Sequence, residues 1–460
     1  MSQLEKYDVV ILGSGAFGKL LSWSLASQGK KTAVVERRYI GGSCPNIACL
    51  PSKNVVHSAK VANEFARHTE FGMAVEGWKV DMAGVRERKR KMVDGLVAMH
   101  QQKYKESGAE LVMGQGRFVA PKTIEVALNG GGTRTLEGAM AIINTGSGAR
   151  IDNIPGLLDA RPLTHIEALE LGELPEHLVV LGGGYVGAEL AQAFRRFGSR
   201  VTVIERNATL VHQEDPDVTA AIEELFRDEK IDVWTGTTVE RVEGQSGKSV
   251  RLRTGRGTLE ATHILVAGGR TPNTDGIGLE KTGVEVDERG HVKVNDRLET
   301  TANGIWAGGD CAGSPYFTHI AEDDFRVVLA NLAGGNRTTV GRQVPFCLFT
   351  DPELARIGLN EREAQERGIR YRLAKLPMMA VLRARTLSET RGFLKALVEE
   401  QGERILGFTA VGPEAGELLP VVQLAMRVEL PYTAITDLVV THPTMAEGLV
   451  SLFSAVPAAR

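Results

Sequence analysis

The sequence predicts an α/β fold that contains two similar units, and three observations support this prediction. Residues 7–36 and 177–205 each open with a short, β-branched apolar run, which is typical of a buried strand. Each segment continues into the pattern G-x-G-x-x-G and a helix-like stretch. Each closes with a second apolar run that ends in a glutamate, Glu36 or Glu205. A strand, a glycine-rich turn, a helix and a second strand in this order indicate a Rossmann-like βαβ unit.

The glycines of both units point to a bound dinucleotide. The first glycine permits a tight turn, the second lets the backbone approach a pyrophosphate, and the third lets helix and strand pack closely. The pyrophosphate rests on the helix N-terminus, where free N–H groups favour an anion, and the distal acid accepts hydrogen bonds from ribose hydroxyls. The predicted contacts are Gly13, Gly15, Gly18 and Glu36 in the first unit and Gly182, Gly184, Gly187 and Glu205 in the second.

Two dinucleotide sites in one chain indicate electron transfer between two dinucleotides. One is a diffusible nicotinamide, NADH or NADPH. The other is FAD as a resident cofactor, because hydride must pass to a group that can hold two electrons. At the second site, the carboxylate of Glu205 favours the 2′-hydroxyl of NADH, whereas Arg206 could neutralise a 2′-phosphate. We therefore predict NADH, with NADPH as the alternative.

The composition fits an ordinary globular protein of roughly two to four domains. The chain has 460 residues, of which 43% are hydrophobic and 24% charged, and its formal net charge is -3. This balance gives no sign of nucleic acid or of an anionic membrane surface as a partner. The basic run Arg86, Arg88, Lys89, Arg90 and Lys91 is interpreted as a solvated helix face.

Neither a membrane span nor a signal peptide is predicted. No apolar stretch approaches the roughly 18 residues needed to cross a bilayer, and the first apolar run passes directly into the glycine motif. Four cysteines are too few for a disulfide scaffold of this length. These features predict a cytoplasmic protein in a compartment where thiols stay reduced, so a close cysteine pair is expected to be redox-active.

Two of the four cysteines, Cys44 and Cys49, lie five positions apart in the segment GGSCPNIACLPSK at residues 41–53. In an ideal α-helix such residues have Cα atoms roughly 8–9 Å apart, whereas a disulfide needs less than about 7 Å. A bond between them therefore requires a distorted turn, which Gly41, Gly42 and Pro45 make feasible. Such a bond is easily reduced, which suits a catalytic disulfide. From the spacing alone, two unrelated buried thiols remain an alternative.

The segment GGSCPNIACLPSK resembles the active-site signature of the FAD-dependent pyridine nucleotide–disulfide oxidoreductases, which include dihydrolipoamide dehydrogenase, glutathione reductase and mercuric reductase. The resemblance covers essentially the whole chain, through AIINTGSGARIDNIPG (141–156), VAGGRTPN (266–273), TANGIWAGGDCAG (301–313), FTDPELARIGL (349–359) and THPTMAEGL (441–449). Two residues depart from the family's pattern: Ala48 replaces the usual glycine, and Ser43 replaces the usual threonine.

The resemblance implies two Rossmann-like dinucleotide-binding domains, for FAD and for NAD(P), and a C-terminal α+β dimerisation domain. The expected ranges are 1–150 for the first part of the FAD-binding domain, 151–270 for the NAD(P)-binding domain, 271–340 for the central, FAD-binding part and 341–460 for the dimerisation domain.

The resemblance also implies roles for individual side chains. Cys49 matches the flavin-facing sulfur, and Cys44 matches the interchange thiol that attacks the substrate. Lys53 resembles the lysine beside flavin N5, and Glu189 resembles its ion-pair partner. Tyr185 matches a residue that shields the flavin until the nicotinamide arrives.

His442 and Glu447, in the segment HPTMAE, match the family's base and the carboxylate that orients its imidazole. Histidine suits this role because its ordinary pKa lies near neutrality. In the family this base reaches the cysteines of the other subunit, so the resemblance implies a homodimer with the active site shared across subunits. The further cofactor contacts that it implies are Ser43, Lys53, Thr145, Gly146, Gly269, Gly309 and Asp310, and no metal ligands are assigned.

The sequence leaves the substrate open. The first hypothesis is a small-molecule disulfide or dithiol that exchanges electrons with Cys44 and Cys49. The alternatives are a metal-ion reductase whose two thiolates hold Hg(II) or copper, a quinone reductase, and a redox-sensing flavoprotein. Residues 316–328 and 376–399 look closer to mercuric reductases and to reactive-chlorine-resistance flavoprotein reductases than to glutathione reductase. The C-terminal segment FSAVPAAR, however, lacks the cysteine pair typical of mercuric reductases.

Overall fold

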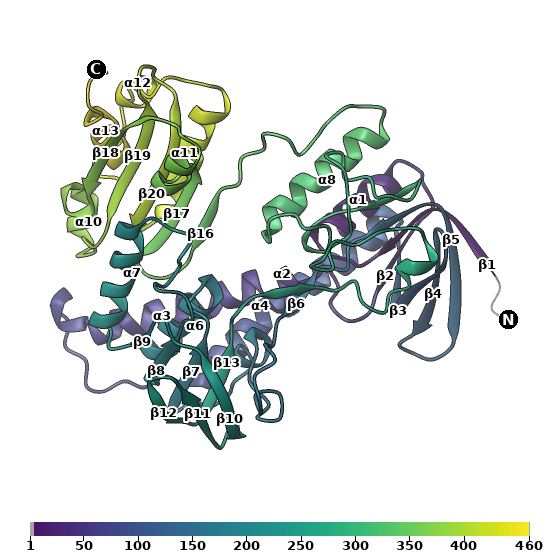
Figure 1. The fold of residues 1–460 in the computed structure, drawn as a ribbon, viewed down its shortest axis with the longest axis horizontal. Helices are drawn as coiled ribbons and strands as arrows, with labels where there is room; N and C mark the ends of the chain where they lie inside the picture. The colour runs from purple at the N-terminus through teal and green to yellow at the C-terminus, as the bar shows by residue number, and fades with distance from the viewer. Residues whose placement is uncertain (1–3, 460) are drawn as a thin grey trace.

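The computed structural model describes residues 4–459, so the ends of the expected domain ranges, residues 1–3 and 460, lie outside the described part. Figure 1 shows three groups of sheets and helices. The N-terminal strands form the group on the right, strands β7 to β13 belong to the group at lower left, and the C-terminal part of the chain forms the group at upper left.

The first sheet contains both strands of the first glycine-rich unit. Its parallel strands follow the order β3-β2-β1-β5-β15, and β4 pairs antiparallel with both β3 and β5. Val9, Val10 and Ile11 are fully buried because parallel sheets are covered on both faces. The strands are β1 (Leu4–Leu12), β2 (Thr32–Glu36), β3 (Glu110–Ala120), β4 (Thr123–Leu128), β5 (Thr133–Ile143) and β15 (Ile305–Ala307).

The second glycine-rich unit forms a separate parallel sheet in the order β13-β7-β8-β9. An antiparallel meander of β10, β11 and β12 follows β9. The strands are β7 (His177–Leu181), β8 (Arg200–Ile204), β9 (Asp232–Trp234), β10 (Val239–Gln245), β11 (Ser249–Thr254), β12 (Gly257–Ala261) and β13 (His263–Val266).

Two short strands carry the chain between these two sheets. They are β6 (Ser147–Ala149) on the way out and β14 (Arg270–Pro272) on the way back, and they pair antiparallel with each other. Nε of Arg270 also donates to Oγ of Ser147 at 2.7 Å. The outgoing and returning segments of the chain therefore cross side by side.

The third sheet is antiparallel throughout, in the order β16-β17-β20-β19-β18. Its strands are β16 (Phe346–Leu348), β17 (Glu353–Gly358), β18 (Tyr371–Pro377), β19 (Phe393–Glu399) and β20 (Ile405–Gly412). Together with α11 (Ala415–Arg427) and α13 (Glu447–Ser454), these strands bury their own apolar core.

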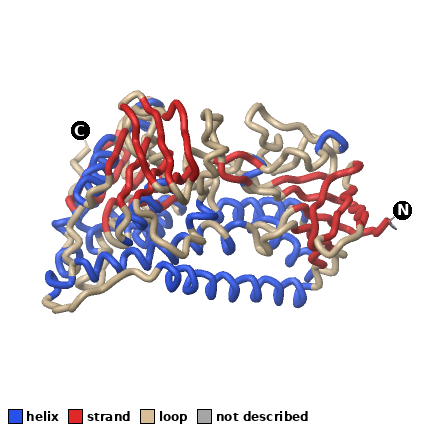
Figure 2. The backbone as a smooth tube through the Cα atoms, turned by 90° about the horizontal axis from the view of Figure 1, so that it is seen from below, coloured by secondary structure: helices blue, strands red, loops and turns tan. Residues whose placement is uncertain are grey.

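The remaining helices connect and cover the sheets, and Figure 2 shows long helices running lengthwise beneath the strands. They are α1 (Ala16–Ser27), α2 (Ser43–Asn46), α3 (Cys49–Ala66), α4 (Met82–Ser107), α5 (His165–Ala168), α6 (Tyr185–Phe197), α7 (Pro216–Asp228), α8 (Thr318–Leu332), α9 (Glu361–Glu366), α10 (Leu382–Thr386) and α12 (Thr433–Thr436). Short 3-10 turns cover His68–Phe71, Leu279–Lys281, Asp310–Ala312 and Met378–Ala380.

The basic run in α4 is not uniformly solvated, so this part of the sequence interpretation was wrong. Lys89 is only 1% exposed, and its ammonium group pairs with the carboxylate of Glu170. Arg90 reaches the other oxygen of the same carboxylate, at 2.7 Å. A buried lysine is tolerated here because a carboxylate neutralises it.

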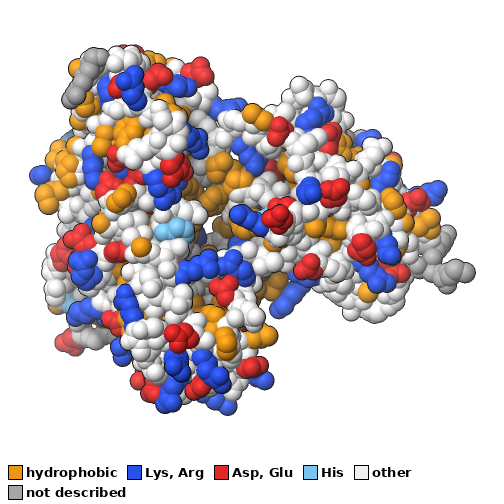
Figure 3. All heavy atoms as spheres, in the orientation of Figure 1, with side chains coloured by type: hydrophobic (Ala, Val, Ile, Leu, Met, Phe, Trp, Pro, Cys, Tyr) orange, Lys and Arg blue, Asp and Glu red, His pale blue; other side chains and the backbone are white. Residues whose placement is uncertain are grey.

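The surface carries both signs of charge. On the face drawn in Figure 3, acidic and basic side chains are interspersed, and a hollow separates the group on the right from the two on the left. None of the helices within residues 4–459 has the length and apolar character that a membrane span requires.

Candidate active site

The two glycine-rich turns bring backbone segments into close approach. A Cβ added at Gly13, whose φ is +103°, would lie 2.1 Å from the carbonyl oxygen of Asn144. A Cβ added at Gly187 would lie 1.9 Å from the carbonyl oxygen of Gly182. Only glycine fits at these two positions, so each helix can start directly against the strand that precedes it.

The acid at the end of each unit closes the adjoining glycine turn. Oε2 of Glu36 accepts a hydrogen bond from the backbone N–H of Ser14 at 3.0 Å. Oε2 of Glu205 accepts from the backbone N–H of Gly183 at 2.6 Å. Both carboxylates are buried at the point where a ribose would follow the pyrophosphate, whereas Arg206 is exposed.

The surroundings of the first unit fit a bound FAD. The hydroxyl of Thr145 is buried and has no hydrogen-bond partner among the described residues. The adjacent Gly146 has a φ of +68° and open space where a Cβ would be. Asp310 accepts a hydrogen bond from Ser147 and lies 3.7 Å from the guanidinium of Arg270. The unpaired hydroxyl of Thr145 and the carboxylate of Asp310 can together hydrogen-bond to the polar chain of a cofactor.

The two cysteines lie on either side of an interrupted helix. Cys44 belongs to α2 and Cys49 opens α3, and Ala48 between them has φ -128° and ψ -104°. Both sulfurs are free thiols, and they lie near enough for each to shift the pKa of the other. The chain therefore has the distorted turn that a Cys44–Cys49 bond requires.

The two thiols differ in their electrostatics. The pKa of Cys49 lies below its ordinary value because Cys44 donates a hydrogen bond to it, with further support from Thr318 and Lys53. The pKa of Cys44 is raised, because its proton is held by Cys49 and because it is buried. The pair therefore favours a thiolate at Cys49 and a thiol at Cys44.

Thr318 is a neighbour of the cysteines that the sequence reasoning missed. It is the first residue of α8, and its Oγ1 lies 3.4 Å from Sγ of Cys49. The two residues are 269 positions apart in the sequence, so no local pattern could have linked them. The hydroxyl can donate to a sulfur anion.

Lys53 and Glu189 form a close ion pair, with 2.6 Å between Nζ and Oε2. Glu189 is buried, and its other oxygen accepts from the backbone N–H of Phe349 at 3.0 Å. The ammonium group also lies over the Phe349 ring, 4.7 Å from its centroid. Because Lys53 is one turn along α3 from Cys49, its positive charge is fixed near the cysteine pair.

Tyr185 begins α6 directly after the second glycine turn. Its ring stacks on Phe346 of β16 at a centroid distance of 5.4 Å, and its hydroxyl donates to Oε1 of Glu214 at 3.3 Å. A dinucleotide whose pyrophosphate rests on the N-terminus of α6 must pass beside this ring.

His442 and Glu447 form a hydrogen-bonded pair, with 3.0 Å between Nδ1 and Oε1. This bond and one from the backbone N–H of Thr444 hold the pKa of Glu447 below its usual range. The imidazole is 64% exposed, and the flanking helices α12 and α13 lie at upper left in Figure 1, away from α2. One chain therefore does not bring this pair to its own cysteines.

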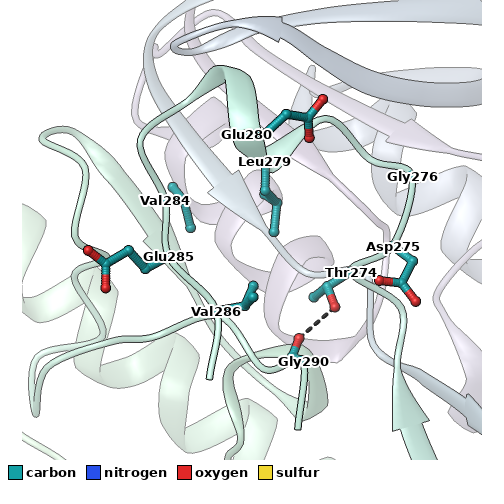
Figure 4. Close-up of a pocket in the computed structure, with 9 residues that line it drawn as sticks. All are labelled: Thr274, Asp275, Gly276, Leu279, Glu280, Val284, Glu285, Val286 and Gly290. Atoms are coloured by element: carbon teal, nitrogen blue, oxygen red, sulfur yellow. Dashed lines mark hydrogen bonds between the residues drawn. The ribbon is translucent and has the colours of Figure 1, made fainter. Parts of the chain in front are cut away.

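Two other features do not join this site. A surface pocket of about 470 Å³ is lined by Leu279 and Val284, but the carboxylates around it point in different directions (Figure 4). The carboxylates of Asp215, Asp217 and Glu361 lie close together, but Nζ of Lys395 bonds all three at 2.7 to 3.0 Å. The buried lysine supplies the positive charge of that cluster.

Comparison with known proteins gives matches over almost the whole chain. Residues 7–324 match the family described as pyridine nucleotide-disulphide oxidoreductase, and residues 344–453 match the dimerisation domain of that family. The chain is 35% identical to the probable pyridine nucleotide-disulfide oxidoreductase RclA of Escherichia coli (strain K12), over 98% of this chain and 100% of that protein.

Two further relatives show similar levels of identity. A mercuric reductase of Staphylococcus aureus is 36% identical over 96% of this chain and 81% of that protein. A mitochondrial dihydrolipoyl dehydrogenase of Pisum sativum is 33% identical over 97% of this chain and 90% of that protein. Among solved structures, the Cu(II) complex of the HOCl-induced flavoprotein disulfide reductase RclA from Escherichia coli superposes with a TM-score of 0.91 and 34% identity, covering 98% of this chain and 100% of that one.

Proposed function

The chain belongs to the pyridine nucleotide–disulphide oxidoreductases, which reduce disulfides with NAD(P)H by way of FAD, and we propose that Cys44 and Cys49 are its redox-active pair. The observation that carries this proposal is the interrupted helix at Ala48, which brings the two thiols near enough for each to shift the pKa of the other. Lys53 and Thr318 then favour a negative charge at Cys49. Such an arrangement suits a dithiol that opens and closes during turnover.

In the proposed reaction, the thiolate of Cys44 attacks one sulfur of the substrate disulfide and displaces the other sulfur as a thiolate. The thiolate of Cys49 then attacks Cys44, which closes the Cys44–Cys49 disulfide and releases the second substrate thiol. The substrate thus gains two electrons, and the cysteine pair loses them. His442 takes the proton from Cys44 and gives it to the departing sulfur, and Glu447 holds the imidazole in place by the bond at Nδ1.

The exposed position of His442 supports a homodimer in which the base of one subunit serves the cysteines of the other. The match to the dimerisation domain fits a homodimer, and the sharing of the site is our proposal. We place the protein in the cytoplasm, where thiols are kept reduced between turnovers.

We assign FAD to the first glycine turn, with Glu36 on its ribose, the hydroxyl of Thr145 and Asp310 on its linking chain, and Lys53 beside its ring system. Ser43, Gly146 and Gly309 complete this cradle. When bound, FAD supplies the two-electron carrier between nicotinamide and disulfide. The second unit, with Gly269 at its return crossover, takes the nicotinamide. The buried carboxylate of Glu205 supports NADH, because it would repel a 2′-phosphate.

For the substrate, we propose a small-molecule disulfide. A metal ion is the second candidate, because two adjacent thiols are soft ligands and a solved relative is described as a Cu(II) complex. Identity does not separate these options, since a mercuric reductase and a dihydrolipoyl dehydrogenase match this chain almost equally.

The test is a panel of acceptors with the purified yellow protein. Oxidation of NADH and of NADPH is followed with lipoamide, glutathione disulfide, Cu(II) and Hg(II). We expect turnover with a disulfide, and we expect Cys44→Ser to abolish it while FAD stays bound and reducible. Cys347→Ser is the matched control, since that thiol is half-buried and does not belong to the proposed redox pair. Turnover with a metal ion alone would favour the second candidate, and failure to turn over with any acceptor of the panel would favour a redox sensor.

A further inference from the structure

Tyr185 is one member of a closed set of contacts that joins the second glycine-rich unit to the third sheet. We call Tyr185, Glu214, Arg356 and Phe346 the gate cluster. The Tyr185 hydroxyl donates to Oε1 of Glu214 at 3.3 Å, and Oε2 of Glu214 lies 3.0 Å from Nε of Arg356. The guanidinium of Arg356 lies 4.9 Å from the centroid of the Phe346 ring, which in turn stacks on Tyr185.

The sheet pairing fixes one side of the gate cluster. Phe346 of β16 and Arg356 of β17 are directly opposite each other in the antiparallel ladder, so both side chains project from the same face. Arg356 is anchored further by Glu363, whose Oε2 accepts from Nη1 at 2.8 Å. Tyr185 and Glu214 come from the other side, at the start of α6 and just before α7.

The hydrogen bond that holds Tyr185 is the weak contact of the gate cluster, although the groups around it are buried. Glu214 and Arg356 are 3% and 8% exposed. Their facing atoms, Oε2 and Nε, do not meet hydrogen-bond geometry although they are 3.0 Å apart. The Tyr185–Glu214 bond of 3.3 Å is also long for a phenol and a carboxylate. A contact that must open and close in each catalytic cycle cannot be strong.

We propose that Glu214, Arg356 and Phe346 are positioning residues that hold Tyr185 across the nicotinamide position, so that the nicotinamide binds only when the ring leaves the gate cluster. This inference rests on the proposed function and on the role that the family resemblance implies for Tyr185, which is to shield the flavin until the nicotinamide arrives. The Glu214 carboxylate holds the hydroxyl, and Phe346 holds the face of the ring. The closed position therefore competes with the nicotinamide, and the apparent dissociation constant depends on the fraction of open protein.

The test measures equilibrium binding of NAD⁺ to the oxidised holoenzyme by calorimetry. Glu214→Gln keeps the size of the side chain and replaces the charged acceptor of the Tyr185 hydroxyl by a neutral amide oxygen. We expect the dissociation constant to fall about fivefold, the factor that corresponds to about 1 kcal/mol, the difference between a hydrogen bond to a charged acceptor and one to a neutral acceptor. Stopped-flow reduction by NADH should reach half its limiting rate at a correspondingly lower concentration, with the limiting rate changed less than about twofold.

Two further variants separate a gate from a structural role. Tyr185→Phe removes only the hydroxyl and should tighten NAD⁺ binding by at least the same factor, so it tests the inference even if Glu214→Gln does not fold. The double variant should bind no more tightly than Tyr185→Phe alone, because both changes act on one hydrogen bond. Glu229→Gln is the matched control, since it removes a carboxylate that pairs with Arg196, away from Tyr185.

Unchanged or weaker NAD⁺ binding in both Glu214→Gln and Tyr185→Phe would overturn this inference. Equal tightening in Glu229→Gln would also overturn it, because loss of any ion pair would then suffice. Both outcomes leave the proposed function intact if NADH still reduces the wild-type flavin. A wild-type holoenzyme that neither binds nor accepts electrons from a nicotinamide would refute the proposed function itself.

Discussion

Replacing Thr318 by valine should raise the pKa of Cys49 by about one unit. The hydroxyl of Thr318 lies 3.4 Å from Sγ of Cys49 and helps to hold the pKa of that thiol below its ordinary value. A hydrogen bond to a charged group is worth about 1.5–3 kcal/mol. Because this contact is long, we take the lower limit, and about 1.4 kcal/mol corresponds to one pKa unit. Valine keeps the branched shape of threonine and removes only the donor.

The assay is the pH dependence of iodoacetamide alkylation in the reduced protein, with Cys49 and Cys44 followed separately by peptide mass spectrometry. Only the thiolate reacts, so the midpoint of the Cys49 rate reports its pKa. Thr318→Ser is the control, because it retains the hydroxyl and should titrate with the wild type. A Thr318→Val midpoint within about 0.2 units of the wild type would mean that the hydroxyl contributes nothing, since 1.4 kcal/mol is a full unit.

Three further predictions concern stability and assembly. Burial lowers the pKa of His165 to about 4, so unfolding takes up a proton there and the stability present above pH 6.5 is lost as the pH falls toward 4. Between pH 7 and 4.5, the free energy of unfolding of His165→Gln, measured by denaturant titration, should therefore fall by roughly 2 kcal/mol less than that of the wild type. An equal fall in both proteins would contradict this. Lys395→Met should lower the free energy of unfolding by about 3–5 kcal/mol, because it leaves the buried carboxylate of Asp215 without its cation. Lys375→Met should lower it by less than about 1 kcal/mol, because that lysine is exposed. Equal losses in thermal denaturation would refute the distinction. Cys44→Ser and His442→Ala chains, each inactive alone, should regain about a quarter of wild-type turnover when they are unfolded together and refolded. About half of the dimers are then mixed, and each mixed dimer has one intact site out of two. No recovery would argue against a site shared between subunits.

The fold was largely predictable, because its main signals are local and repeated. The α/β class and the family expected from the sequence are confirmed by the match over residues 7–324 and by the structural similarity to RclA. Each glycine motif lies between two parallel strands, since a strand, a tight turn and a helix are specified within about 30 residues. Strand β15, only three residues long, carries too little pattern of its own to predict.

The candidate site was predictable only where one segment contains the chemistry. Because Cα atoms five positions apart in an ideal helix are too far from each other for a disulfide, a distorted turn was predicted between Cys44 and Cys49, and the structure has a helix break there. Thr318 could not be found in this way, because its contact depends on how α8 returns to the first sheet. The burial of Lys89 was missed for a similar reason, since its partner Glu170 is 81 positions away. A sequence shows that a residue is charged, but its burial depends on remote neighbours.

The pairing of β6 with β14 also constrains how the two nucleotide-binding parts can move. The outgoing segment β6 and the returning segment β14 form one two-stranded ribbon, so neither strand can shift along the other without breaking the hydrogen bonds between them. The packing of α3 against α6 and the ion pair between Lys53 and Glu189 join the same two parts at a second place. Arg270 of this ribbon donates to Ser147 and lies 3.7 Å from the carboxylate of Asp310, so the ribbon is tied directly to the residue that we assign to the linking chain of FAD.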